Sequence, residues 1–164
     1  MSLSPEVYRH LAYRGKTEGV IGLMHTKEHR LRDLEGLSEA PLILVAESPE
    51  KPGNIGALLR TADAAGLDAV IIADPRGDLY NPNVIRSSVG CLFTVPVATG
   101  SSREILEFLR ERDMQVLGAA LGDSKRYDLV DYTKPTAILV GTESTGLTPF
   151  WMQHCDSRVA IPLL

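Results

Sequence analysis

Two loops of this sequence combine polar side chains with glycines in patterns suited to binding a phosphate or a nucleotide. In the first, Asn54 and Arg60 lie six residues apart within a stretch of helical apolar spacing. Asn54 fits a helix N-cap, because its side chain can accept a bond from the first free N–H groups. Arg60 stands off the apolar stripe beside small residues, and its planar guanidinium suits a phosphate. Alternatively, Asn54 only caps the helix and Arg60 pairs with Asp63; the spacing leaves both interpretations open.

The second loop runs from Val140 to Leu147 and contains a carboxylate between two glycines. Gly141 and Gly146 are five residues apart, as in a phosphate-binding P-loop, but Leu147 stands where that motif needs lysine. Nucleotide hydrolysis therefore loses support. Backbone without a Cβ can still approach a ligand closely beside Glu143. The alternative is that the glycines shape a turn and Glu143 places charge at the next helix's N-terminus.

A third segment, residues 81–90, begins like a capped helix at Asn81 and delivers Arg86 with two hydroxyls to one neighbourhood. Plain surface charge is the default interpretation of Arg86. The four histidines form no HExxH pair, the two cysteines form no CxxC, and there is no GxSxG elbow. The sequence thus gives no support for a metal site, a disulfide framework or a serine hydrolase.

The elements that must position these loops alternate between two patterns. Short apolar runs predict strands buried on both faces at 42–46, 69–73, 92–97, 116–120, 137–140 and 159–161. Helical patterns occur between them at 55–65, 103–112 and 149–155. This alternation predicts an α/β fold with a parallel sheet flanked by helices. Ligands of such sheets bind beyond the carboxyl ends of the strands, where the loops above lie.

Residues 1–40 are mixed in character and punctuated by glycines, although 24–34 could form a short amphipathic helix. We therefore divide the chain into a leader, 1–40, and a domain, 41–164. No apolar run approaches the length of a membrane span and no signal peptide is recognisable, so we expect a cytoplasmic protein without membrane contact. The net charge of −4 argues against a strongly basic nucleic-acid coat. Because 12 of the 17 basic residues are arginine, a local basic surface remains open.

Together these stretches resemble the SpoU/TrmH family of SPOUT methyltransferases, which transfer a methyl group from S-adenosyl-L-methionine to a ribose 2′-hydroxyl of RNA. The resemblance covers residues 41–164 and rests on three motifs in order, at 54–62, 139–147 and 161–163. Segments 86–90 and 131–135 also look like this family.

The resemblance implies an α/β knot, in which the C-terminal part of the sheet forms a deep trefoil knot around the cofactor pocket. It implies a homodimer whose active sites are completed by the partner. Arg60 would be the catalytic arginine, Asn54 its helper and Glu143 the carboxylate that organises the site; Arg60 and Arg86 would contact RNA. The residues binding S-adenosyl-L-methionine would be Ala119, Ala120, Leu139, Gly141, Ile161 and Leu163. In the family a Ser-Leu-Asn loop and a closing helix follow the third motif, so we expect the domain to be incomplete at Leu164, its C-terminal closing segment absent.

The main hypothesis is a 2′-O-ribose methyltransferase acting on tRNA or rRNA. A non-catalytic RNA-binding or dimerisation module of the same fold is the alternative, and the intact Asn54, Arg60 and Glu143 disfavour it. A third hypothesis, a nucleotide-binding α/β protein, would gain support from cofactor binding that does not depend on RNA. The choice of RNA has no local code in the sequence.

Overall fold

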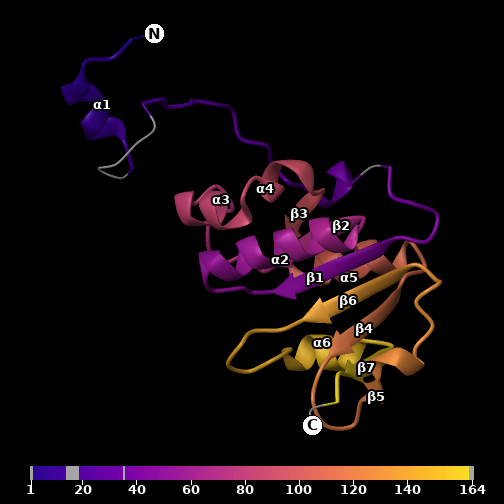
Figure 1. Cartoon of the computed structure of the whole chain (residues 1–164). Coiled ribbons are helices and arrows are strands. Elements are labelled where there is room, and N and C mark those ends of the chain that lie inside the picture. The colour runs from indigo at the N-terminus through magenta and orange to yellow at the C-terminus, as the bar shows by residue number, and fades with distance from the viewer. Residues whose placement is uncertain (1, 14–18, 35, 163–164) are drawn as a thin grey trace.

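A computed structural model describes residues 2–13, 19–34 and 36–162 (Figure 1). The domain is built on a seven-stranded sheet in the order β3-β2-β1-β6-β4-β7-β5, with every neighbouring pair parallel. The strands are β1 (Leu42–Glu47), β2 (Ala69–Ala73), β3 (Val97–Gly100), β4 (Gln115–Ala119), β5 (Lys125–Arg126), β6 (Thr136–Val140) and β7 (Ser157–Ala160). This arrangement confirms the predicted parallel sheet flanked by helices. The trefoil knot stays a prediction.

Helices cover both faces of the sheet, because alternate strand residues point to opposite sides. On one face Leu44 and Ala46 belong to a core cluster with α2 (Pro52–Ala65), α3 (Pro82–Ser88) and α4 (Cys91–Thr94). On the other face Ile43 and Val45 belong to a cluster with α5 (Ser102–Arg110) and α6 (Pro149–His154). Strands β1 and β2 are therefore buried on both sides, which explains their continuous apolar runs.

The predicted strand at 92–97 is wrong. Leu92 lies in α4, and β3 begins only at Val97. Val89 and Gly90 both have positive φ angles, 53° and 96°, so the chain reverses after α3 and makes a short helical turn before the strand. Leu92, Val95 and Val97 are all buried in the same cluster. A short apolar run does not reveal whether it is buried as a strand or as a helical turn.

The N-terminal part also differs from its prediction. The expected helix at 24–34 is wrong: within it the structure has only a 3-10 turn, η1 (Leu31–Asp33). The backbone of residue 29 continues the sheet edge, since Thr99 N–H donates to His29 O over 2.7 Å. Leu34 is buried in the core. The division at residue 40 stays a prediction.

Further toward the N-terminus, α1 (Pro5–Leu11) buries no residue and lies apart from the sheet (Figure 1). Within the three described ranges, no helix is both long and apolar enough to cross a membrane. The remaining short element, η2 (Tyr127–Leu129), follows β5.

Candidate functional site

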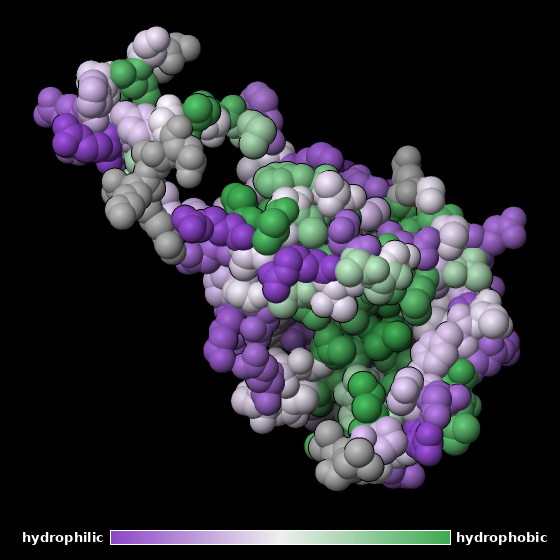
Figure 2. All heavy atoms as spheres, viewed as in Figure 1, coloured by the Kyte–Doolittle hydropathy of each residue, from purple (hydrophilic) through white to green (hydrophobic). Residues whose placement is uncertain are grey.

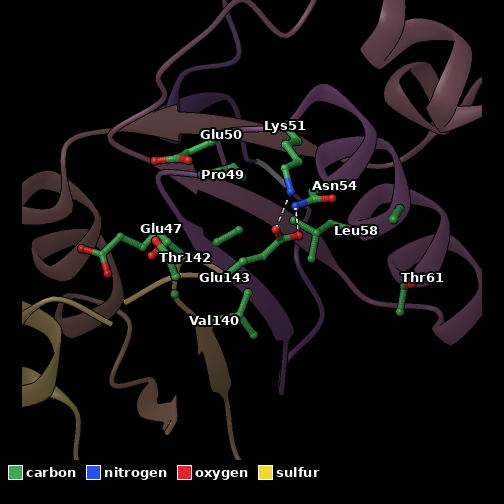
Figure 3. A pocket seen from close by; sticks show the side chains of 14 residues that line it. Glu47, Pro49, Glu50, Lys51, Asn54, Leu58, Thr61, Val140, Thr142 and Glu143 are labelled. Atoms are coloured by element: carbon green, nitrogen blue, oxygen red, sulfur yellow. Dashed lines mark hydrogen bonds and ion pairs between the residues drawn. The ribbon is translucent and has the colours of Figure 1, made fainter. Parts of the chain in front are cut away.

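The sheet order brings the first two motif loops together. β1 and β6 are neighbours with Ala46 paired to Val140, so the loops that leave their carboxyl ends lie side by side. Asn54 Nδ2 donates to Glu143 Oε1 over 2.5 Å, and Lys51 Nζ donates to Glu143 Oε2 over 2.9 Å (Figure 3). Two motifs separated by about 90 residues thus meet through one carboxylate.

Asn54 is not the N-cap that the spacing predicted. Proline favours the first turn of a helix, and α2 accordingly begins at Pro52, with Lys51 at the N-cap position. Asn54 therefore lies inside the first turn, and its side chain crosses to Glu143. The resemblance assigned both residues to one site, whereas the capping argument did not connect them; their catalytic roles stay a prediction.

The cluster borders a pocket of about 450 Å³. One wall is a single face of α2 at helical spacing, formed by Asn54, Ala57, Leu58 and Thr61, and the opposite wall is the chain from Val140 to Ser144. The floor lies at the end of β1, around Glu47 (Figure 3). Its lining combines apolar side chains, such as Leu58 and Val140, with polar ones, as ligand sites usually do.

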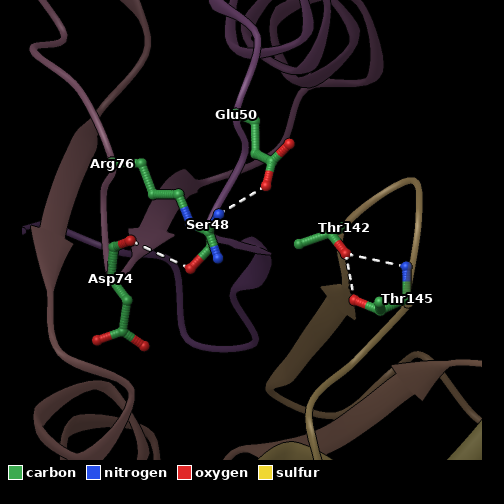
Figure 4. Close-up of polar contacts among 6 residues, drawn as sticks. All are labelled: Ser48, Glu50, Asp74, Arg76, Thr142 and Thr145. Atoms are coloured by element: carbon green, nitrogen blue, oxygen red, sulfur yellow. Dashed lines mark hydrogen bonds and ion pairs between the residues drawn. The ribbon is translucent and has the colours of Figure 1, made fainter.

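The loop after β6 is a tight turn. Thr142 and Gly146 exchange backbone hydrogen bonds of 3.1 and 3.0 Å, and the hydroxyls of Thr142 and Thr145 are 2.7 Å apart (Figure 4). A Cβ added at Gly141 would lie 2.0 Å from the backbone carbon of Gly146, so no other residue fits there. The glycines do shape a turn, as the alternative interpretation held, but Glu143 extends to Lys51 and Asn54 instead of charging the next helix.

The charges in the cluster stabilise each other. The hydrogen bond from Lys51 is the main cause that lowers the pKa of Glu143, and the bond from Asn54 and the charge of Lys51 add to it. The hydrogen bond to Glu143 raises the pKa of Lys51 in turn. Both groups are therefore ionised around neutral pH. Glu143 accepts from Asn54 Nδ2 and so orients the Asn54 side chain. Asn54 Oδ1 accepts no hydrogen bond from the described residues.

Arg60 lies outside this pocket. Six residues beyond Asn54 it emerges on another side of α2, where it is exposed and donates from Nη1 to the Ser87 carbonyl of α3. The predicted alternative, an Arg60–Asp63 pair, is absent from the ion pairs of the described residues, and Asp63 accepts from Thr94 instead. Arg86, the residue before Ser87, is also exposed.

The residues predicted for the cofactor lie at the carboxyl ends of three adjacent strands. Ala119 ends β4 and pairs with Val159 of β7, while Ala120 N–H donates to Val159 O over 3.1 Å. Gly141 follows β6, and Ile161 follows β7 with 70% of its surface exposed. Leu139 is 1% exposed and its side chain packs in the core, so only its backbone could face a ligand. Leu163 lies outside the described residues.

Sequence reasoning missed Lys51, the cation that balances Glu143. The available signal was its position three residues before Asn54, which places both on the same side of the first helical turn. It also missed a second ion pair at the rim, in which Arg76 Nη1 lies 2.6 Å from Glu50 Oε1 (Figure 4). Across the described ranges, no group of three or more His, Cys, Asp or Glu could hold a metal ion.

Comparison with known proteins identifies one family. The model of the SpoU rRNA Methylase family matches residues 41–164. The chain is 37% identical over 124 residues to the 23S rRNA (uridine(2479)-2'-O)-methyltransferase of Streptomyces viridochromogenes, covering 71% of this chain and 43% of that protein. It is 33% identical over 129 residues to the 23S rRNA (guanosine(2553)-2'-O)-methyltransferase of Bacillus subtilis, covering 79% and 52%. The chain spans about half the length of these relatives.

Solved structures show the same similarity. An AdoMet-bound rRNA methyltransferase from Sinorhizobium meliloti superposes with a TM-score of 0.88 at 26% identity, covering 98% of this chain and 62% of that one. The SpoU methyltransferase AviRb from Streptomyces viridochromogenes gives a TM-score of 0.76 at 31% identity, covering 84% and 55%.

Proposed function

Because the chain belongs to the SpoU rRNA methylase family, we propose that the protein transfers a methyl group from S-adenosyl-L-methionine to a ribose 2′-hydroxyl of ribosomal RNA. The observation that carries this proposal is the meeting of the two motif loops, in which Asn54 of the first is bonded to Glu143 of the second beside a pocket. The relatives named above are 23S rRNA 2′-O-methyltransferases, which favours rRNA over tRNA. A ribosomal substrate also places the proposed activity in the cytoplasm.

The residues at the carboxyl ends of β6, β4 and β7 fit the cofactor. They offer backbone groups and small or apolar side chains, from Gly141, Ala119, Ala120 and Ile161, at one edge of a parallel sheet. This is where nucleoside cofactors bind in such sheets. The bound cofactor supplies an electrophilic methyl group, and the chain must supply everything else.

The chain's own residues have two tasks in this reaction. They must hold the ribose hydroxyl in line with the methyl group, and they must receive or stabilise the charge as the proton leaves. Asn54, held by Glu143, offers Oδ1 to orient the ribose. Arg60 contacts the RNA together with Arg86, where a phosphate would compete with the Ser87 carbonyl for the guanidinium.

Arg60 has two available roles, because a guanidinium is protonated at neutral pH and is a poor base. In one, the guanidinium first gives a proton to a neighbouring RNA phosphate and then takes the proton that leaves the ribose hydroxyl. In the other, it stabilises the forming alkoxide by its charge. Both roles require Arg60 to reach the reacting ribose.

We propose that the protein acts as a homodimer. Arg60 lies outside the pocket that holds Asn54 and Glu143, which supports a site completed by a second copy. Below α2, the sheet also presents an apolar hollow that none of the described helices covers in this view (Figure 2). In the pocket on this face of the sheet, Val140 of β6 and Leu58 of α2 are only partly buried.

The test is nucleoside mass spectrometry of unmethylated 23S rRNA incubated with the protein and S-adenosyl-L-methionine. We expect one new 2′-O-methyl nucleoside, and we expect Arg60→Ala to abolish it while cofactor affinity, measured by calorimetry, stays within about twofold of the parent. Arg103→Ala, an exposed arginine on the opposite face of the sheet, is the matched control and should keep full activity.

Full activity of Arg60→Ala would contradict the assignment of this arginine. RNA binding without any methylated product, while cofactor binding is retained, would instead favour the alternative function of a non-catalytic RNA-binding module.

A further inference from the structure

A buried carboxylate lies at the end of β1, directly beneath the pocket. Glu47 is 3% exposed, and both of its oxygens accept hydrogen bonds from Thr148, the residue directly after the second motif loop. Thr148 N–H donates to Oε2 over 2.9 Å, and Thr148 Oγ1 donates to Oε1 over 2.7 Å. The two residues are about 100 positions apart in the sequence.

Packing does not explain this carboxylate. The rest of β1 is apolar, and burial of an ionised group is costly unless a cation accompanies it. None of the ion pairs among the described residues includes Glu47. An apolar residue would serve the core better, so the carboxyl group has another use.

The Thr148 hydroxyl bonds to Glu47 and makes no capping bond to its own helix. Thr148 is the N-cap residue of α6, where a threonine hydroxyl ordinarily accepts a bond from its own helix. Here the side chain makes no capping bond, and its hydroxyl donates to Glu47 instead. The contact therefore replaces the usual stabilisation of the helix start with an anchor to β1.

This anchor fixes the end of the loop that begins at Gly141. Leu147, one residue before Thr148, is buried, and its Cδ1 lies 3.0 Å from where a Cβ of Gly118 would be. Thr148 thus holds Leu147 against β4, next to the strand end at Ala119. The backbone hydrogen bonds between Thr142 and Gly146 join the two ends of the turn. The position of Leu147 therefore also sets the position of Glu143, which lies within the turn.

We propose that Glu47 is a positioning residue, which sets the 141–148 loop for S-adenosyl-L-methionine through its two bonds to Thr148. The inference rests on the function proposed above and names the element that prepares the cofactor side of the site. α6 has a second anchor, because Trp151 is fully buried and its Nε1 donates to Ser102 Oγ over 2.9 Å. Loss of the Glu47 contact should therefore loosen the loop without unfolding the helix.

The experiment compares Glu47→Gln, Thr148→Val and their double variant with the parent. Cofactor affinity is measured by calorimetry, loop exchange by amide hydrogen–deuterium exchange at 142–147, and methyl transfer at varied cofactor concentration. We expect each single variant to weaken cofactor binding at least tenfold and to raise its KM, with kcat little changed at saturation. In the double variant the two losses should not add, because both substitutions disrupt the same pair of residues.

Two controls separate positioning from general stability. Thr148→Ser keeps both donors and should bind like the parent. Asp156→Asn alters a carboxylate that precedes β7 and accepts from Val116 N–H over 2.7 Å. This contact lies at the amino ends of the strands, opposite the carboxyl ends that border the pocket. This variant should lower stability but leave cofactor affinity and loop exchange unchanged.

A folded Glu47→Gln protein with parental cofactor affinity and parental loop exchange would overturn the proposal. If the parent itself bound no cofactor, the proposed function would fail, and faster exchange at 142–147 in Glu47→Gln would still support the anchor.

Discussion

At the scale of single residues, Glu143 is the centre of the site because two donors from one helical turn converge on it. Lys51 neutralises the charge and Asn54 receives its orientation from the same carboxylate. The folded-state pKa of Glu143 is lowered, so the cluster is intact at neutral pH and is lost as the pH falls through that value. The pKa of Lys51 is raised, so its contribution is present below 10.5 and disappears as the pH rises through the higher folded value.

This geometry predicts the titration of one carboxyl group. By carbon-detected NMR, the side chain of Glu143 should titrate below its ordinary value of 4.5. In Lys51→Met the value should move upward, because the largest cause of the shift is removed. Lys125→Met, an exposed lysine on β5, should leave the titration unchanged. An identical Glu143 titration in the parent and in Lys51→Met would refute the pairing.

At the scale of elements, the close packing of α2 on α3 holds Arg60 at its place. A Cβ added at Gly56 would lie 2.1 Å from Ser87 Oγ and 2.6 Å from the Ser87 backbone carbon. The small residue that seemed to leave room for a phosphate in fact admits α3. Its approach brings the Ser87 carbonyl to the Arg60 guanidinium.

A substitution at this contact tests the arrangement. Gly56→Ala should destabilise the protein by about 1–3 kcal/mol, since overpacking forces two helices apart. In Gly53→Ala, also in α2, the new Cβ meets nothing within 4 Å, and we expect a change of under about 1 kcal/mol. Urea denaturation monitored by circular dichroism measures both. Equal effects of the two substitutions would show that α3 does not press on Gly56.

Strands could be predicted from the sequence where a continuous apolar run is buried on both faces of the sheet. The runs at 42–46 and 69–73 are strands because parallel sheets bury both faces, and that requirement is visible as continuous apolar sequence. The run at 92–97 was not predictable, since its structure depends on a backbone reversal at Val89 and Gly90. The Glu143 cluster followed from the resemblance, whereas Lys51, Glu47 and Thr148 became visible only once the sheet order placed β1 beside β6.

At the scale of the whole molecule, the apolar hollow under α2 exposes apolar surface that a binding partner could bury (Figure 2). A second copy of the chain is the partner that we propose, and Leu58 lies at the border of this surface. A charge there would oppose burial of the surface, because an unpaired ion in an interface is costly.

The corresponding prediction concerns mass in solution. The parent should be a dimer by light scattering after size-exclusion chromatography, and Leu58→Glu should shift it to monomer with its circular dichroism retained. Leu23→Glu, at a leucine that is 99% exposed in the N-terminal segment, should remain dimeric. A monomeric parent at micromolar concentration would disprove the proposed assembly.

The order of the strands also determines how the chain must fold. β1 and β6 are central partners, yet Leu42 and Thr136, which pair across them, are separated by about 90 residues. During synthesis β1, β2 and β3 can assemble early, but one edge of β1 stays open until β6 has emerged. Bringing β6 to β1 across so long a segment lowers the chain entropy before the strand pairing adds stability. Folding should therefore be slow for a domain of this size. Until then, the unpaired β1 edge is the part of the nascent chain most prone to aggregation.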